Sequence, residues 1–184
     1  MSSSDYHFVT RWRVESTVDE VYDVLSEPTD LVRWWPSVYL GVQELEPGDE
    51  DGVGKVVKLY TKGWLPYTLR WQFRVTEAQK PHGFKLAAWG DFIGQGIWQF
   101  VQHGASVDIT YDWKIRAGKS LLRLFSWLLK PVFSANHHWA MTKGEQSLKL
   151  ELRRRSTEDQ DNIPPPPGPM FPHNLRRAPA SENN

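Results

Sequence analysis

His137 is the residue whose type and position in this chain could most directly do chemistry. One segment near the end of the chain repeats apolar residues at helical spacing, and His137 falls on that stripe with Phe133 and Met141. His138 is turned away by about 100°. An inward imidazole can act as a general acid or base or anchor a ligand, with Asn136 beside it as a hydrogen-bond donor. The alternative is a histidine at the edge of the core that bonds to a strand, and we favour it because the sequence shows no base–nucleophile pair.

Other kinds of chemistry find little support in the sequence. The six histidines show no metal-ligand spacing and the chain has no cysteine, so we expect no metal site and no disulfide. The sequence contains neither a phosphate-binding glycine loop nor a nucleophile elbow, and we expect no cofactor. Arg70 and Asp112 fall on the polar sides of their strands, and Asp91 lies among glycines, where capping a turn is the default role. Because no two carboxylates share an inner face, paired acid–base catalysis has no support either.

Large aromatic side chains share one face of several predicted strands. Residues 67–75 and 106–115 both alternate in this way. The residues that we expect to contact a ligand are Trp71, Phe73, Trp98, Tyr111 and Trp113 from the strands, and Phe133, Asn136, His137 and Met141 from the helix. Each aromatic residue taken alone is better explained as core filling. Small residues on the facing surfaces leave room, however, namely Ala88, Gly90, Ala140 and Gly144. Together the set predicts an apolar pocket of more than about 300 Å³.

A long helix is predicted from residue 120 to residue 155. Its first part carries leucines at spacings of three and four, and the apolar stripe of its second part lies about a third of a turn away. Pro131 explains the offset, because its ring clashes with the carbonyl four residues back and the helix kinks or breaks there. A helix with one long apolar side needs a broad apolar partner, and the strands between residues 38 and 115 are the only candidate.

The part of the chain before this helix is predicted to form strands and two short helices. The alternation in residues 7–15 indicates a strand, and Ser16 or Thr17 can cap a short helix that Pro28 closes. A second short helix follows, and then about six strands between residues 38 and 115. These strands are joined by short turns and should pair as antiparallel neighbours. The predicted class is α+β, with a curled sheet whose apolar face meets the long helix.

Composition limits the kinds of partner. The 22 basic and 22 acidic side chains balance, which gives no electrostatic case for nucleic acid or an anionic membrane. No uncharged run approaches the roughly 20 residues needed to cross a bilayer, and we expect a soluble, cytoplasmic protein. After residue 155 the chain becomes polar and proline-rich. We therefore predict one domain over residues 1–155 and a disordered proline-rich tail over residues 156–184.

Several phrases of the sequence resemble a known family. They are Ser16-Thr-Val-Asp-Glu-Val-Tyr-Asp-Val-Leu, Trp34-Trp-Pro-Ser-Val, Gly52-Val-Gly, Gly90-Asp-Phe-Ile-Gly-Gln-Gly-Ile-Trp and Asn136-His-His-Trp-Ala-Met-Thr-Lys-Gly-Glu-Gln-Ser-Leu. In this order they are similar to the polyketide cyclase/dehydrase branch of the START-related (SRPBCC) superfamily. The resemblance implies a helix-grip fold, with a curved antiparallel sheet of about seven strands wrapped around a long C-terminal helix and two short helices after the first strand. It also implies a cavity between sheet and helix that takes an apolar ligand.

Three functions follow as hypotheses. The first is binding of a hydrophobic small molecule, of lipid, polyketide or isoprenoid type, between the sheet and the long helix. The second is a cyclase or dehydratase that uses the same cavity, since such catalysis needs little beyond positioning and one acid–base group. The third is an interaction module that contacts a protein through the tryptophan-proline clusters at 34–36 and 63–67 and through the proline-rich tail. The sequence leaves the oligomeric state open.

Overall fold

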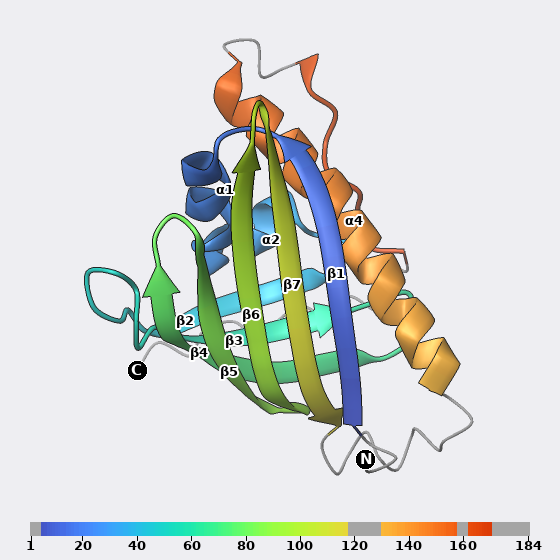
Figure 1. The fold of residues 1–184 in the computed structure, drawn as a ribbon. Helices are drawn as coiled ribbons and strands as arrows, with labels where there is room; N and C mark the ends of the chain where they lie inside the picture. Colours follow the sequence, from blue (N-terminus) through green and yellow to red (C-terminus); the bar gives the residue numbers. More distant parts are fainter. Residues whose placement is uncertain (1–4, 118–129, 158–161, 171–184) are drawn as a thin grey trace, which may run out of the picture.

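A computed structural model describes residues 5–117, 130–157 and 162–170 (Figure 1). In chain order the elements are β1 (Asp5–Glu15), α1 (Val18–Leu25), the 3-10 turn η1 (Pro28–Asp30), α2 (Leu31–Trp34), β2 (Tyr39–Glu46), β3 (Val56–Lys62), β4 (Thr68–Gln79), β5 (Gly83–Gly90), β6 (Phe92–His103), β7 (Ser106–Ala117) and α4 (Lys130–Ser156). This order confirms the predicted class: a first strand, short helices, six more strands and a long final helix.

The seven strands form one antiparallel sheet in the order β1-β7-β6-β5-β4-β3-β2. Consecutive strands from β2 to β7 are neighbours, as their short turns predict. The exception is β1, which pairs with β7, so that Phe8 lies opposite Trp113. In Figure 1 the sheet bends so that β2, β3 and β4 run across the direction of β1, β6 and β7, and α4 passes along the open side.

The short helices carry the chain from one edge of the sheet to the other. Thr17 caps α1 by accepting from the Glu20 amide, and the Glu20 carboxylate accepts from the Thr17 amide in return, so the two residues form a capping box. Of the two predicted caps, Thr17 is the one used. After the turn at Pro28, α2 places Trp34 and Trp35 inside the molecule, where they are 0% and 3% exposed.

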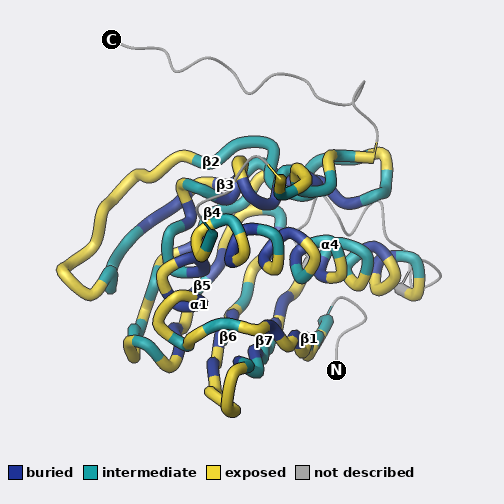
Figure 2. Tube along the Cα trace, turned by 90° about the horizontal axis from the view of Figure 1, so that it is seen from above, coloured by how far each residue is buried: buried dark blue, intermediate teal, exposed yellow. Residues whose placement is uncertain are grey.

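The final helix packs its apolar side against the sheet. In α4, which has 27 residues, Phe133, Met141, Leu148 and Leu152 are all buried. Pro131 lies in the first turn of α4, where its missing N–H costs no intrahelical hydrogen bond. The helical segment predicted over residues 120–129 lies outside the described residues. Figure 2 shows buried and exposed positions alternating along α4 and along β6, as expected for elements with one side toward the core.

A buried carboxylate links α2 to α4. Glu151 is 2% exposed and accepts two hydrogen bonds from Arg33, at 2.8 and 2.7 Å, one from Arg155 at 2.8 Å and one from Arg154 at 3.3 Å. Burial alone would raise the pKa of this carboxyl, but the bonds from Arg33 and Arg155 outweigh it and lower the pKa to about 2. The ion pair between Arg33 and Glu151 fixes the position of α2 against α4, and with it the positions of Trp34 and Trp35.

The chain after α4 contacts the domain at residues 162–170. Arg154 donates a hydrogen bond of 3.2 Å to the carbonyl oxygen of Pro164. The domain boundary at residue 155 and the disorder of the segment 156–184 stay predictions. Within the described ranges, no helix is long and apolar enough to span a bilayer.

Candidate functional site

A cavity lies between the sheet and α4. Seven of the nine residues predicted to contact a ligand line it: Trp71, Tyr111, Trp113, Phe133, Asn136, His137 and Met141. The other two, Trp98 and Phe73, do not line the cavity. Trp98 stacks on Tyr111 with ring centroids 4.1 Å apart, and Phe73 faces a separate small hollow together with Tyr22 and Phe84. The register of the sheet brings these residues together, because Trp98 lies opposite Tyr111 in the β6–β7 ladder.

The cavity is smaller than the sequence predicted. Its volume is about 100 Å³, against the expected minimum of about 300 Å³. Two of the small residues leave no open room. A Cβ at Gly144 would overlap the ring of Trp35, and a Cβ at Gly90 would lie 2.9 Å from the Arg70 carbonyl oxygen. The space next to Gly144 is therefore filled by the indole ring of Trp35.

His137 lies at the cavity wall in a fixed orientation. Its ring stacks on Phe8 of β1, with centroids 4.1 Å apart and planes 19° apart. Its Nε2 atom is buried and has no hydrogen-bond partner among the described residues. The expected bond to a strand is thus not made by this nitrogen, and the contact with the strand is ring stacking instead. Burial, with a smaller contribution from the charge of His138, lowers the pKa of His137 to about 4, so the imidazole is neutral at pH 7.

Asn136 joins α4 to the segment between β3 and β4. Its side-chain oxygen accepts a hydrogen bond of 3.1 Å from the Leu65 amide. Gly63 lies against the same side chain so closely that a Cβ there would overlap the amide group. Asn136 is 6% exposed and also lines the cavity. Its first role is therefore to hold residues 63–65 over this end of the cavity.

Residues that were not predicted to contact a ligand also line the cavity, among them Trp35, Tyr39 and Lys62. Burial raises the pKa of Tyr39 and lowers that of Lys62, which is 1% exposed. Alternation along β3 turns Thr61 inward and would turn Lys62 outward, but Lys62 ends the strand. The alternation of inward and outward side chains does not hold at the end of a strand. Nothing in the sequence indicates that Lys62 lines the cavity.

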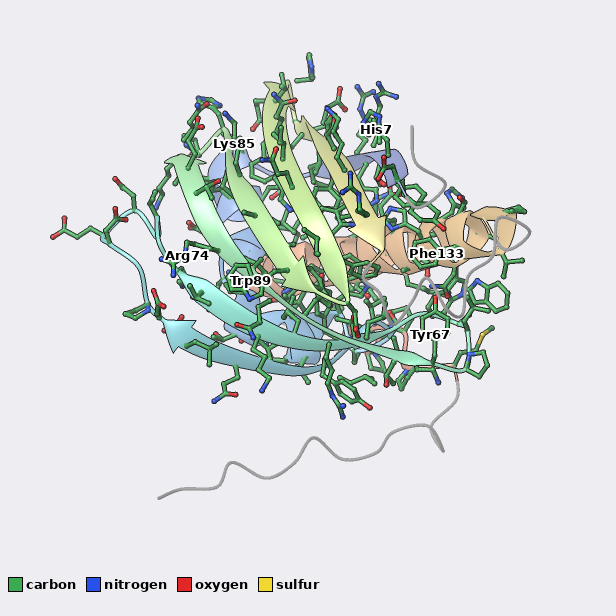
Figure 3. All side chains as sticks on the ribbon, turned by 90° about the horizontal axis from the view of Figure 1, so that it is seen from below. His7, Tyr67, Arg74, Lys85, Trp89 and Phe133 are labelled. Carbon is green, nitrogen blue, oxygen red and sulfur yellow. The ribbon has the colours of Figure 1, made fainter. Side chains whose placement is uncertain are left out.

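The tryptophan-proline clusters do not form one exposed surface. Trp34 and Trp35 are buried, so the first cluster offers no surface of these two side chains to a partner protein. In the second cluster Trp64 and Leu65 are half-buried and Pro66 is exposed. Figure 3 shows Tyr67 near Phe133, at the end of the molecule far from Arg74 and Lys85. The second cluster therefore lies beside the start of α4.

The described residues offer no obvious place for a metal ion. No group of three or more histidine, aspartate or glutamate side chains in these ranges is arranged to hold one. The polar side chains that line the cavity include the His137 imidazole, the Asn136 amide, the Lys62 amine, the Thr61 hydroxyl and two hydroxyl-bearing rings, Tyr39 and Tyr111. Such a set can orient a small molecule by hydrogen bonds and can move a proton, within walls that are mostly aromatic.

Comparison with known proteins identifies the fold. No family model and no curated protein matches the sequence. The structure is similar to the Zhui aromatase/cyclase from Streptomyces sp. R1128, with a TM-score of 0.62 and 17% identity over 84% of this chain and 97% of that one. It is also similar to TTHA0849 from Thermus thermophilus, with a TM-score of 0.64 and 12% identity over 83% of this chain and 100% of that one. Norcoclaurine synthase from Thalictrum flavum has a TM-score of 0.56 and 15% identity over 81% of this chain and 96% of that one. These likenesses confirm the helix-grip fold.

Proposed function

We propose that the protein binds a hydrophobic small molecule in the cavity between the sheet and α4. The observation that carries the proposal is the cavity itself, whose walls are mostly aromatic and whose lining residues His137 and Trp35 each have a buried ring nitrogen, the His137 Nε2 among them, without a hydrogen-bond partner among the described residues. Protein groups of this kind are normally satisfied, so a ligand that reaches one of these nitrogens would gain from it. The likeness in fold to an aromatase/cyclase supports the same interpretation.

The ligand classes proposed from the sequence are lipids, polyketides and isoprenoids. Each is larger than about 100 Å³, so the cavity would have to widen on binding. Met141 is suited to this because its side chain is unbranched and adaptable. The segment held by Asn136 can also move once the bond to Leu65 opens. Desolvation of apolar surface, at roughly 25 cal/mol per Å², would supply most of the binding free energy.

Intrinsic fluorescence tests the proposal directly. Trp35, Trp71 and Trp113 line the cavity, so titration with a fatty acid, a sterol or an aromatic polyketide is expected to give a saturable change in emission. Met141→Phe should fill the cavity. It should therefore weaken the affinity for the ligand, measured from this change in emission, at least tenfold. Met170→Phe is the matched control, because Met170 is 55% exposed.

Extraction of the purified protein, followed by mass spectrometry, gives an independent measurement. A hydrophobic compound that is recovered with wild-type protein and lost in Met141→Phe would support the proposal. No recovered compound, together with no fluorescence response to any of the three ligand classes, would refute it.

A second candidate is a cyclase or dehydratase that uses the same cavity. The observation that favours it is the neutral, inward imidazole of His137, which can accept or return a proton at pH 7. Incubation with poly-β-ketone chains, with product analysis by mass spectrometry, separates this function from binding alone. His137→Gln should then lower turnover by about a hundredfold, at the low end for loss of one acid–base group, while saturable binding is retained.

A further inference from the structure

The size of the cavity limits what it can hold without rearrangement. Its volume is about 100 Å³. An engineered apolar cavity of about 150 Å³ is known to bind benzene, and the present cavity is smaller than that, so one six-membered ring is the upper limit and fused rings do not fit. The side of the cavity that Trp35 forms is also rigid. Trp35 packs so tightly on Gly144 of α4 that no methyl group fits between them.

The walls favour a flat, uncharged ring. Trp71 lies 5.7 Å from Trp113, and Tyr111 stacks on Trp113 at 5.6 Å, so rings already pack on rings around the space. Aromatic pairs prefer centroid separations between about 4.5 and 7 Å, and a single guest ring would extend this arrangement.

Two buried ring nitrogens of residues that line the cavity bear on the chemistry of the guest. Trp35 Nε1 has no hydrogen-bond partner among the described residues and can only donate. His137 Nε2 is likewise buried without a partner in these ranges, and stacking on Phe8 fixes the plane of its ring. The histidine nitrogen either accepts or donates a hydrogen bond, according to which tautomer is present. A hydroxyl group can do both, so it satisfies Nε2 in either tautomer. A carbonyl or ether oxygen satisfies only one tautomer, and a hydrocarbon satisfies neither.

From these observations we infer that the cavity takes a monocyclic aromatic alcohol, of the size of phenol, whose hydroxyl group hydrogen-bonds His137 Nε2. The inference rests on the proposed function and narrows its ligand class. The competing polar group is Lys62, whose amine would favour an anionic guest such as a carboxylate. The test must therefore distinguish a guest that carries a hydroxyl group from a guest that carries a carboxylate.

The test compares guests that differ in their polar group or in the number of rings, on the full chain, by calorimetry and by NMR of ¹⁵N-labelled protein. Phenol is expected to bind about tenfold more tightly than benzene, the equivalent of one net hydrogen bond. It is also expected to bind at least tenfold more tightly than benzoate or 1-naphthol. His137→Phe keeps a ring against Phe8 but removes the nitrogen, and it should abolish the preference for phenol over benzene. His138→Phe alters the neighbouring residue, which does not line the cavity, and should keep the preference.

A measurement on wild-type protein keeps the test valid if His137→Phe does not fold. The ¹⁵N resonance of His137 Nε2 should shift when phenol is added and should not shift with benzene. Equal binding of phenol and benzene, or tighter binding of benzoate or 1-naphthol than of phenol, would overturn the inference. If fatty acids, sterols or polyketides bind while phenol does not, the inference fails and the proposed function stands. If none of these compounds binds, the proposed function itself fails.

Discussion

At the scale of single residues, Glu151 is the charged side chain on which the position of α2 depends. It is almost fully buried, and its partners Arg33, Arg155 and Arg154 are about half, one third and one fifth exposed. Removal of one partner from a buried ion pair costs about 3–5 kcal/mol, because a charge is left without compensation. Here water reaches all three arginines, and the cost should be at the lower end.

The first prediction is that Glu151→Gln lowers the free energy of unfolding by about 3 kcal/mol, measured by urea denaturation. Glu145→Gln is the matched control. It removes a solvent-exposed pair with Lys149 on the same helix, and it should change the free energy by less than about 0.5 kcal/mol. Equal effects of the two substitutions would contradict the role given to Glu151.

The same variant should change the response to acid. The pKa of Glu151 is lowered to about 2 from an ordinary value of 4.5, so the ionised form stabilises the folded protein above pH 4.5. This contribution is lost as the pH falls from 4.5 toward 2, because the unfolded state binds the proton first. Glu151→Gln should therefore flatten the loss of stability over that interval.

The position of His137 could be predicted from the sequence, whereas its surroundings could not. Helical spacing turns His137 toward the sheet and His138 away, and the structure shows the same difference in burial. The stacking on Phe8 depends on β1 pairing with β7, across about a hundred residues of chain. Periodicity within a segment carries no information about such a contact.

At the scale of elements, Asn136 connects α4 to the segment between β3 and β4. The second prediction is that Asn136→Ala releases this segment, because the Leu65 amide loses its acceptor. Loss of one hydrogen bond to a buried group costs about 1–3 kcal/mol. Hydrogen exchange at the Leu65 amide should accelerate by at least tenfold.

Ser134→Ala is the control for this prediction, since Ser134 lies on the exposed side of the same helix and the substitution should leave exchange at Leu65 unchanged. Unchanged exchange in Asn136→Ala would show that other contacts hold the segment. Faster exchange with faster ligand entry would identify the segment as the way into the cavity.

Strands and helices were predictable where their own periodicity is strong. The alternation in β4 and β7 and the cap at Thr17 all identify elements without tertiary information. Trp34 and Trp35 show the opposite case. Their burial depends on α2 being held against α4 by Arg33 and Glu151, a contact between residues 118 positions apart.

At the scale of the whole molecule, the fold was predictable and the volume of its cavity was not. A curled sheet around one helix follows from the order and polarity of the elements. The space left between them depends on side-chain packing to within one ring, as the overlap between Trp35 and a Cβ at Gly144 shows. Gly144 indicated empty space in the sequence, but the ring of Trp35, from a distant part of the chain, occupies that space.

The third prediction concerns the domain boundary. A chain that ends at Thr157 should fold with a melting temperature within about 3 °C of the full chain, because the bond from Arg154 to Pro164 is exposed and weak. A chain that ends at Lys149 lacks Glu151 and Leu152 and should not fold. Thermal unfolding followed by circular dichroism checks both. A fall of more than about 10 °C for the first truncation would place residues after 157 within the folded unit.

The pairing of β1 with β7 has a consequence for synthesis in the cell. Residues 5–15 are synthesised about a hundred residues before their partners in the ladder, residues 106–116. At ordinary translation rates this interval is on the order of ten seconds. For that time the nascent chain exposes an unmatched strand that contains Phe8, Trp12 and Val14, so a chaperone bound to this strand would protect the protein while it is being made.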